Sequence, residues 1–562
     1  MSSTTSLPGA KPAPSATHLP STMQPRPLLV RRLLEHGTTL HSGSEVITAT
    51  DAGTRTATYA EVGRNAARLA HALAGLGVGP GDRVATFMWN NQEHLEAYLA
   101  VPAMGAVIHP LNIRLFPEQI TYIADHAEDT VVIVDSSLLP VFAALLPEMR
   151  TVRHVIVNRQ PAGAEAPPEA PGVSVHDYAR LLEDRPGTYD WPDVDENQAA
   201  GMCYTSGTTG NPKGVVYSHR SLYLHSLGIS LPDLMNISAA DRLLVIVPQF
   251  HAQAWGLPYA AFLTGASLAM PDRYLAPAPL AAFIAASRPN KGAGVPTVWQ
   301  GLAGHVQQHR DADISSLREA VVGGSSCPPS LMRTYEEEFG IRLLHAWGMT
   351  EISPLGALAR EPEGTQGEDA WRYRLSQGRF PAPVEARLIG QDGAVLPWDG
   401  RSVGELEVRG PWITGSYHLD DDPEKFHDGW LRTGDVGTIT ADGFLTLTDR
   451  VKDVIKSGGE WISSVELENH LMAHPAVAEA CVVGVPDDKW GERPLAAVVL
   501  RDGSTAAHGE LRGFLAGKVA PWQLPERWAS VAEVPKTSVG KFDKKALRKS
   551  YAAGELAVDV ID

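Results

Sequence analysis

The alternation of short apolar segments with helical patterns is the strongest constraint on what this chain can fold into. The segments "DRVATFMW" (82–89), "DTVVIVD" (129–135) and "VRHVIVN" (152–158) have the length and composition of buried strands. The segment "YAEVGRNAARLAHALAGLGV" (59–78) spaces Ala, Leu and Val as a helix does. This alternation predicts an α/β fold in which helices flank parallel-rich sheets.

The pattern changes after Pro383. Short strands are then interrupted by the turn signals "QDG" and "WDG", which predicts a small β-barrel-like subdomain. Roughly 110 residues follow "DRVKDVIKSGGEWIS" (449–463) and carry helix and strand patterns of their own, a common size for an independent domain. We therefore expect a small α+β C-terminal domain. Residues 1–26 are rich in Ser, Thr, Pro and Ala and predict a disordered tail.

The length and net charge of the chain limit the kinds of protein that it can be. A chain of 562 residues is too long for one core, so two or more domains are expected. The net charge of −17 argues against broad binding to nucleic acid or to an anionic membrane. No apolar run approaches the roughly 18 residues that a membrane span needs.

The cysteines and the N-terminus indicate a reducing compartment. Cys203, Cys327 and Cys481 are far apart and form no C-x-x-C pair, so neither a disulfide framework nor a zinc site is predicted. The N-terminus lacks a basic start followed by an apolar run, so we expect no signal peptide. We therefore predict a cytoplasmic protein.

The segment "YTSGTTGNPKGVVYSH" (204–219) gathers glycines, hydroxyl side chains and a lysine. It is not a Walker A loop, because that loop needs G-x-x-x-x-G-K-[ST] and here Gly210 is followed by Asn211. Glycines nevertheless allow close backbone approach, and successive N–H groups can form an anion-binding nest. From the residues alone, a phosphate cradle and an ordinary flexible surface loop both remain open.

The order of residues in "YTSGTTGNPKGV" resembles the signature loop of the adenylate-forming (acyl-activating) enzyme family. That family includes acyl-CoA synthetases, aryl-CoA ligases, luciferases and the adenylation domains of peptide synthetases. The resemblance is strongest to long-chain and medium-chain fatty-acyl-CoA synthetases and extends roughly over residues 58–549. It implies that this loop holds the β- and γ-phosphates of ATP through Thr205, Ser206, Gly207, Thr208, Thr209, Gly210 and Lys213.

Further motifs complete the nucleotide site that the resemblance implies. In "HAWGMTE" (345–351), Trp347 replaces the commoner tyrosine and would stack on adenine, and Thr350 would approach the α-phosphate. Glu351 would hold Mg²⁺ with Thr205 nearby. The remaining ATP-binding residues that the resemblance implies are Gly324, Ser325, Ser326, His345, Ala346, Gly348, Asp435 on the ribose hydroxyls, and Arg450.

The C-terminal region resembles the mobile domain of the family. Lys541, in "TSVGK", matches the catalytic lysine that would bridge the acyl carboxylate and the α-phosphate. The resemblance implies a large N-terminal domain (27–449), a hinge (450–452) centred on Lys452, and a rotating C-terminal domain (453–562). Rotation would bring in the thiol tunnel for coenzyme A, formed by Lys456, Ser457, Gly458, Gly459, Glu460 and Trp461.

The segment "VPQFHAQAWG" (247–256) resembles the acyl side of the family's site. His251 would steer the carboxylate or order the thiol, and Trp255 stands where long-chain members carry a gate tryptophan. Val295 and Gly324 complete the acyl pocket implied by the resemblance. From the residues alone, a core histidine remains an alternative for His251.

We therefore predict an acid–thiol ligase that uses ATP, Mg²⁺ and coenzyme A, acting on a carboxylic acid that we expect to be a fatty acid. The motifs leave several alternatives open. These are an aryl or other acid, a carrier protein as acceptor, and adenylation of nitrite for diazotisation of an aryl amine. A nucleotide-binding pseudoenzyme is a further alternative, against which the presence of Lys541, Glu351 and Asp435 argues. The resemblance to long-chain members also implies a homodimer.

Replacing Lys541 by alanine tests the proposed catalytic role. We expect Lys541→Ala to lower pyrophosphate release by about 100-fold or more, because a positive charge at the reacting phosphate is lost. Nucleotide binding, measured by calorimetry, is expected to persist. Lys549→Ala, in the same basic run, is the matched control. Normal pyrophosphate release by Lys541→Ala would show that the lysine has no part in adenylation.

Overall fold

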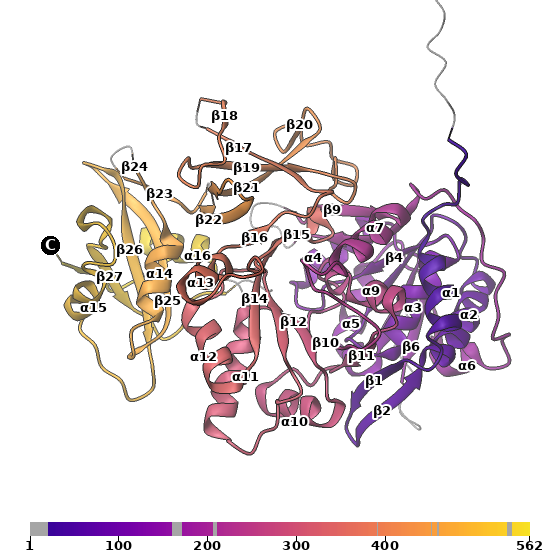
Figure 1. The fold of residues 1–562 in the computed structure, drawn as a ribbon. Helices are drawn as coiled ribbons and strands as arrows, with labels where there is room; N and C mark the ends of the chain where they lie inside the picture. Colours follow the sequence, from indigo (N-terminus) through magenta and orange to yellow (C-terminus); the bar gives the residue numbers. More distant parts are fainter. Residues whose placement is uncertain are drawn as a thin grey trace, which may run out of the picture.

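The structure is a computed structural model that describes residues 21–159, 171–205, 211–390, 392–450, 452–457, 460–536 and 542–561. Within these residues the chain forms three β-sheets (Figure 1). Two of the sheets lie in the larger part of the chain, and the third contains only C-terminal strands. The α/β class predicted from the sequence is confirmed.

The first sheet has seven strands in the order β7-β6-β5-β3-β4-β8-β9. All neighbours in it are parallel except the final β8–β9 pair. Its interior strand β5 is buried on both faces, as expected for a strand with helices on either side. The strands are β3 (Arg83–Phe87), β4 (Val107–Pro110), β5 (Val131–Asp135), β6 (His154–Asn158), β7 (Ser174–Asp177), β8 (Ala199–Tyr204) and β9 (Gly214–Ser218).

The second sheet contains a parallel half built from strands far apart in sequence. In order they run β14-β13-β12-β10-β11-β1, with β2 antiparallel at the edge. The strands are β1 (Glu45–Thr50), β2 (Gly53–Thr58), β10 (Arg242–Val245), β11 (Ser267–Met270), β12 (Lys291–Gly294), β13 (Glu319–Val322) and β14 (Arg342–Gly348).

Helices connect and cover these strands. Helix α2 begins where the sequence predicts, because Thr58 and Glu61 form a reciprocal capping box at its first turn. The helices of the larger part are α1 (Val30–Leu40), α2 (Tyr59–Gly75), α3 (Gln92–Ala103), α4 (Pro117–His126), α5 (Leu139–Leu145), α6 (Tyr178–Leu182), α7 (His219–Ile229), α8 (Ala252–Trp255), α9 (Leu257–Thr264), α10 (Pro277–Ser287), α11 (Pro296–Gln308), α12 (Pro329–Phe339) and α13 (Gly367–Leu375), with short 3-10 turns at Ser136–Leu138, Leu146–Glu148 and Thr350–Ile352.

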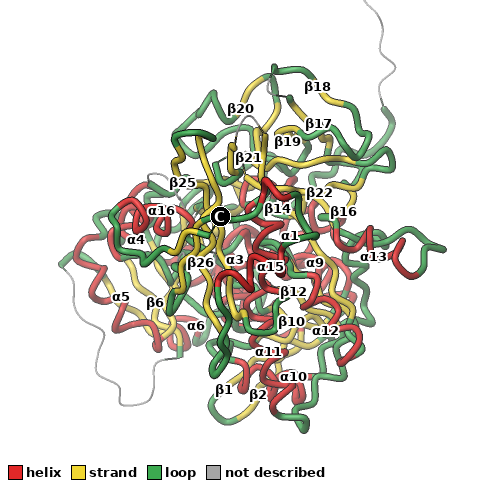
Figure 2. The backbone as a smooth tube through the Cα atoms, turned by 90° about the vertical axis from the view of Figure 1, so that its left-hand side faces the viewer, coloured by secondary structure: helices red, strands yellow, loops and turns green. Residues whose placement is uncertain are grey.

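The second sheet continues from β14 into an antiparallel half through β15, β16 and β22. Figures 1 and 2 show β17–β20 standing beyond the end of the parallel layer. This is the β-rich subdomain expected after Pro383. The strands of the whole antiparallel half are β15 (Leu355–Leu358), β16 (Gly378–Arg379), β17 (Glu385–Ile389), β18 (Val395–Leu396), β19 (Gly404–Arg409), β20 (Phe426–His427), β21 (Trp430–Ile439) and β22 (Phe444–Arg450).

The third sheet is built from C-terminal residues alone and has its own buried cluster around Trp528. Its strands are β23 (Ile455–Ser457), β24 (Glu460–Ile462), β25 (Val477–Asp487), β26 (Gly491–Leu500), β27 (Arg527–Ser530) and β28 (Asp559–Val560). They are accompanied by helices α14 (Ser464–Met472), α15 (His508–Leu515) and α16 (Lys544–Ala552) and by a 3-10 turn at Pro521–Gln523.

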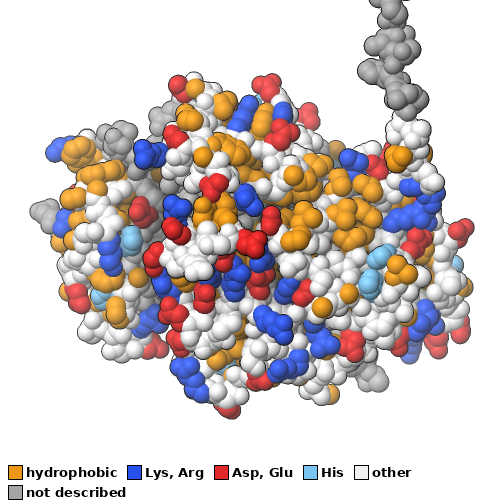
Figure 3. All heavy atoms as spheres, viewed as in Figure 1, with side chains coloured by type: hydrophobic (Ala, Val, Ile, Leu, Met, Phe, Trp, Pro, Cys, Tyr) orange, Lys and Arg blue, Asp and Glu red, His pale blue; other side chains and the backbone are white. Residues whose placement is uncertain are grey.

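None of the helices in the described part of the chain is long and apolar enough to cross a membrane. On the face in Figure 3, acidic and basic side chains are interspersed, so this face carries no extended field of one sign.

A buried ionic cluster joins the two large sheets. Asp135 ends β5 of the first sheet, and Asp272 follows β11 of the second. Arg159 Nη2 lies 3.1 Å from Asp135 Oδ1 and 2.8 Å from Asp272 Oδ2. Asn91 Nδ2 donates to both carboxylates, at 2.9 and 3.3 Å. The two aspartate side chains are only 1% and 3% exposed, so they depend on this guanidinium for charge compensation.

Removing that guanidinium should loosen the junction between the sheets. We expect Arg159→Met to cost about 3 kcal/mol, because two carboxylates stay buried without a counter-ion. Thermal unfolding followed by calorimetry should show a melting temperature lowered by a few degrees. Arg310→Met is the control, because its partner Glu338 lies 3.5 Å away in an exposed pair that should contribute little. Equal effects of the two substitutions would contradict this role.

Candidate active site

A cavity of about 510 Å³ lies where the carboxyl ends of strands from both large sheets converge. Residues at or just beyond the ends of β8, β12, β13 and β14 line it. Binding sites in α/β proteins commonly form at this edge, because the connecting loops meet there. The antiparallel half contributes Tyr417, Asp422, Gly434 and Arg450, the last residue of β22, and the segment after β22 contributes Lys452.

The stem of the glycine-rich loop opens into this cavity. Thr205 N donates to the carbonyl oxygen of Lys213 at 2.9 Å, and Lys213 N donates to Thr205 Oγ1 at 3.2 Å. These bonds continue the β8–β9 ladder, so Thr205 and Lys213 face each other across the loop. Residues 206–210, which include Ser206, Gly207, Thr208, Thr209 and Gly210, lie outside the described residues.

Lys213 lies between two carboxylates and an aromatic ring. Its Nζ is 2.7 Å from Asp422 Oδ2 and 3.0 Å from Asp420 Oδ2, and it lies 4.9 Å from the centre of the Tyr417 ring. Partial burial opposes the charge, but the two carboxylates outweigh it and raise the pKa of Lys213. Lys213 therefore presents a permanent positive charge at this end of the cavity.

Glu351 is a buried carboxylate at the wall of the same cavity. Tyr417 Oη donates to its Oε1 at 2.6 Å. Burial and the nearby Glu351 carboxylate raise the pKa of Tyr417, so its hydroxyl remains a donor. The neighbouring Thr350 is held by Tyr217, whose Oη donates to the Thr350 carbonyl oxygen at 2.8 Å.

The groups around Glu351 suit a magnesium ion that is held mainly by the phosphate groups of the substrate. The described residues contain no group of three or more His, Cys, Asp or Glu side chains that could hold a metal ion on their own. Mg²⁺ commonly uses one or two carboxylates and completes its shell with water and phosphate oxygens. Glu351 supplies one such carboxylate, and Thr205 supplies a hydroxyl on the same cavity wall.

Trp347, Asp435 and Arg450 form a linked row beside the cavity. Trp347 Nε1 donates to Asp435 Oδ2 at 2.7 Å, and Arg450 Nε lies 3.2 Å from Asp435 Oδ1. Asp435 and Arg450 are direct partners across β21 and β22, so strand register brings them together. The Asp435 carboxylate raises the pKa of Arg450. A carboxylate has about four acceptor positions, so Asp435 can still accept from another ligand.

Another part of the cavity wall, here called the apolar end, is lined by apolar side chains and two glycines. A Cβ on Gly323 would lie 3.3 Å from the Trp255 ring, and a Cβ on Gly324 would lie 3.3 Å from Val295 Cγ1. These two glycines therefore let the β13 loop approach Trp255 and Val295 closely. His251 and Ala252 line the same region.

Helix α8, beside this apolar end, has an unusual backbone. Its residues Ala252, Gln253, Ala254 and Trp255 have φ of 42°, 56°, 52° and 55°. A left-handed turn costs roughly 1–2 kcal/mol per residue for side chains other than glycine. Such strain concentrates at functional sites. Composition gives no sign of it, since this turn contains no glycine.

Several predicted site residues are not on the cavity wall. Ser325 and Ser326 follow Gly324 but are not among the described residues that line the cavity, and neither are Lys456 and Ser457. His345 lies behind the wall, where burial lowers its pKa to about 4 and keeps the ring neutral. Lys541, Gly458 and Gly459 lie outside the described residues, while Glu460 and Trp461 belong to β24.

Other wall residues were not found from the sequence. Met235, Tyr417, Asp422 and Lys425 line the cavity. The motif "GPWITG" precedes Tyr417, but it gives no indication of the bond to Glu351. Each of these residues is brought to the site by contacts that are distant in sequence.

Comparison with known proteins places the chain in a family. The model of the AMP-binding enzyme family matches residues 38–418, and that of the AMP-binding enzyme C-terminal domain matches residues 466–541. The chain therefore belongs to the AMP-binding enzyme family.

Individual relatives are similar over nearly their whole length. The chain is 44% identical over 532 residues to a medium-chain-fatty-acid–CoA ligase of Ectopseudomonas oleovorans, covering 93% of this chain and 96% of the relative. It is 42% identical to a 3-methylmercaptopropionyl-CoA ligase of Ruegeria lacuscaerulensis, with 94% and 98% covered. The crystal structure of ATP-bound MatB from Rhodopseudomonas palustris is 26% identical and superposes with a TM-score of 0.78, covering 93% and 99%.

These findings establish the type of reaction. The protein is an AMP-forming acid–thiol ligase. It activates a carboxylic acid with ATP to acyl-AMP and pyrophosphate, and it then joins the acyl group to the thiol of coenzyme A with release of AMP. Enzymes of this class use ATP, Mg²⁺ and coenzyme A.

The proposed role of Asp435 can be tested by measuring how its substitution changes the KM for ATP. We expect Asp435→Asn to raise the KM for ATP about tenfold or more, because a hydrogen bond to a charged group contributes about 1.5–3 kcal/mol. The measurement is pyrophosphate release at varied ATP. Asp442→Asn, in the turn between β21 and β22, is the control, because its carboxylate bonds Tyr373 and Thr440 instead. An unchanged KM for ATP in Asp435→Asn would remove Asp435 from the nucleotide site.

Proposed function

We propose that the protein is a fatty-acyl-CoA ligase whose substrates are unsubstituted acids of medium chain length. The observation that carries this proposal is the division of the 510 Å³ cavity into a charged end and an apolar end. Lys213, Glu351 and Arg450 lie at the charged end, and Trp255 and Val295 lie at the apolar end. An alkyl chain suits the apolar end because it needs no ionic partner there.

The names of two relatives support this substrate class. The Ectopseudomonas enzyme is named for medium-chain fatty acids, and the Ruegeria enzyme for 3-methylmercaptopropionate, a short thioether acid. Both acids carry an uncharged, unbranched tail. A straight apolar pocket beginning at Trp255 would accept either.

The first half-reaction needs charge stabilisation and positioning rather than a protein nucleophile. We assign the β- and γ-phosphates to Lys213 and the loop that begins at Thr205. Asp435 would accept the ribose hydroxyls, and Trp347 would lie against the adenine. The acid carboxylate attacks the α-phosphorus, the bond to the β-phosphate oxygen breaks, and pyrophosphate leaves. Thr350 would donate to the α-phosphate, and Lys541 would bring its charge to the same oxygens.

Glu351 and Thr205 are the residues we propose as magnesium ligands. Bound magnesium would neutralise phosphate charge as pyrophosphate departs. Tyr417 would hold Glu351 in place, since its hydroxyl already donates to one carboxylate oxygen at 2.6 Å.

The second half-reaction would require rotation of the C-terminal domain. We propose the division into residues 27–449, a hinge at 450–452 and residues 453–562, as the sequence indicates. Arg548 of α16 donates to the carbonyl oxygen of Lys452 at 3.2 Å and pairs with Asp453 at 2.9 Å, so the hinge contacts a helix that would move. Rotation would bring Lys456, Ser457 and the segment 458–461 to the acyl-AMP, where the thiol attacks the carbonyl and AMP leaves.

The remaining assignments concern assembly and location. A homodimer is proposed from the resemblance to long-chain members. A cytoplasmic location is supported by the three cysteines, which are buried and free, as expected in a reducing compartment. A carrier protein remains an alternative acceptor to coenzyme A.

A panel of acids tests the proposal directly. We expect pyrophosphate release and an acyl-CoA product with saturated acids of intermediate length, because their tails fill the apolar end without a charged group. The panel should contain butanoate to hexadecanoate, 3-methylthiopropionate, cinnamate and aminobenzoate, with products identified by mass spectrometry. Malonate is the control, since its second carboxylate would be buried without a partner. Activity with aryl acids alone, or adenylation without a CoA adduct, would overturn the proposal.

A further inference from the structure

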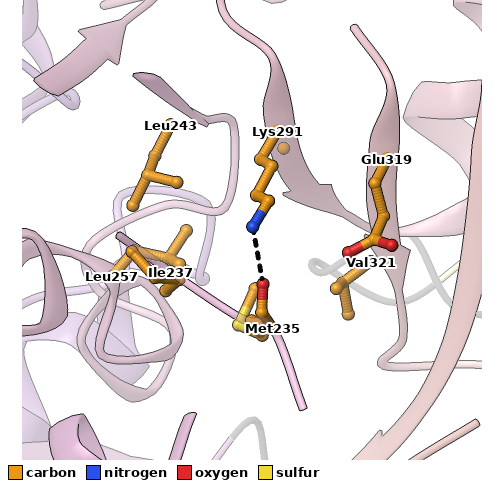
Figure 4. Close-up of a pocket in the computed structure, with 8 residues that line it drawn as sticks. Met235, Ile237, Leu243, Leu257, Lys291, Glu319 and Val321 are labelled. Carbon is orange, nitrogen blue, oxygen red and sulfur yellow. Dashed lines mark hydrogen bonds between the residues drawn. The ribbon is translucent and has the colours of Figure 1, made fainter. Parts of the chain in front are cut away.

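A second, smaller cavity lies directly behind the active-site cavity. It has a volume of about 10 Å³, roughly the space of one water molecule. Its walls include Ile237, Leu243 and Leu257, all buried (Figure 4). Two residues, Met235 and Val321, line both this small cavity and the 510 Å³ cavity. The two spaces are therefore separated by the thickness of these side chains.

The two cavities follow one face of the parallel sheet. On β13, Val321 lies two residues after Glu319, and Gly323 follows two residues further on. Residues two apart on a strand share a face and lie about 7 Å apart. Gly323 and Val321 line the large cavity, and Val321 and Glu319 line the small one. A straight tail that enters beside Gly323 would thus pass Val321 and point at the small cavity.

The lining of the small cavity also contains polar groups that already have partners. Lys291 and Glu319 face each other across neighbouring strands β12 and β13. Glu319 pairs with Arg360 at 2.7 Å, and Lys291 pairs with Asp241 at 3.2 Å. Because these charges are compensated, an alkyl tail could reach them without leaving a buried charge unpaired, but it could not continue past them.

Hydrogen bonds hold the backbone at Met235, and its side chain is buried between the two cavities. Met235 N donates to the carbonyl oxygen of Ile229 at 3.0 Å. Lys291 Nζ donates to the carbonyl oxygen of Met235 at 3.1 Å, as Figure 4 shows, and also to that of Asn236. The Met235 side chain is only 7% exposed and lies between the two cavities. Methionine is unbranched and adapts to the shape of its surroundings.

We propose that Met235 sets the acyl chain length, as the side chain that ends the open acyl pocket and closes off the small cavity behind it. This inference rests on the proposed fatty-acid function. A tail that stops at Met235 is of medium length. Truncating Met235 joins the two cavities and allows a longer tail to reach Ile237, Leu243 and Leu257.

The dependence of activity on the length of the acyl chain tests the role of Met235 directly. The experiment determines kcat/KM for acyl-CoA formation with saturated acids from butanoate to hexadecanoate. Burying one additional methylene group is worth about a factor of four. We expect Met235→Ala to move the optimum two or more carbons longer and to raise the ratio of kcat/KM for the longer to the shorter acid about tenfold. Met235→Phe should move the optimum shorter.

Two controls separate selectivity from stability. Leu234→Ala removes a neighbouring buried side chain that lines neither cavity. It should keep the wild-type profile even if the folded fraction falls, because the ratio of two acids does not depend on enzyme concentration. Should Met235→Ala fail to fold, Met235→Phe and Met235→Leu still report on the same wall.

The results distinguish the role of Met235 from the fatty-acid function on which that role rests. Wild-type activity with fatty acids, together with unchanged profiles in the Met235 variants, would overturn the role of Met235 and leave the fatty-acid function standing. Absence of any fatty-acyl-CoA with the wild-type protein would overturn both.

Discussion

Compensation of buried charge at one end of a cavity is the constraint on which the site depends. Lys213 lies between Asp420 and Asp422, Glu351 accepts from Tyr417, and Asp435 lies between Trp347 and Arg450. Glu351 and Asp435 are buried, so removing the partner of either would leave a carboxylate out of water without compensation. The same groups are those a polyphosphate and its metal would engage, so ligand binding exchanges partners rather than creating charge in an unprepared site.

Much of the fold could be predicted from the sequence, because its signals are local. The predicted strand at 129–135 is β5 (Val131–Asp135), and the predicted helix at 59–78 is α2 (Tyr59–Gly75). The motifs expected to bind the nucleotide are continuous stretches of sequence. Their residues Thr205, Lys213, Trp347 and Glu351 all line one cavity. Thr205, Trp347 and Glu351 converge because each lies at or just after the carboxyl end of a strand, a property that periodicity detects. Lys213 joins them because it faces Thr205 just before the antiparallel strand β9.

The remaining parts of the site depend on distant contacts that no local pattern encodes. Tyr417 and Glu351 are 66 residues apart, and Lys213 and Asp422 are 209 apart. Met235 follows a helix in a segment without any motif, and only the tertiary structure brings it between two cavities. The left-handed turn at Ala252–Trp255 lacks the glycines that would signal it, because the surrounding packing imposes the conformation.

Trp347 stands where the family more often has tyrosine, and its indole N–H adds a hydrogen bond to the site. The indole N–H donates to Asp435, and strand register places Asp435 opposite Arg450. The aromatic residue expected against adenine is therefore linked through one carboxylate to Arg450, the first residue of the proposed hinge. A nucleotide whose ribose hydroxyls bond Asp435 would share that carboxylate with Arg450. Under the proposed roles, nucleotide binding would be coupled to the position of Lys452 through these side chains and one pair of neighbouring strands.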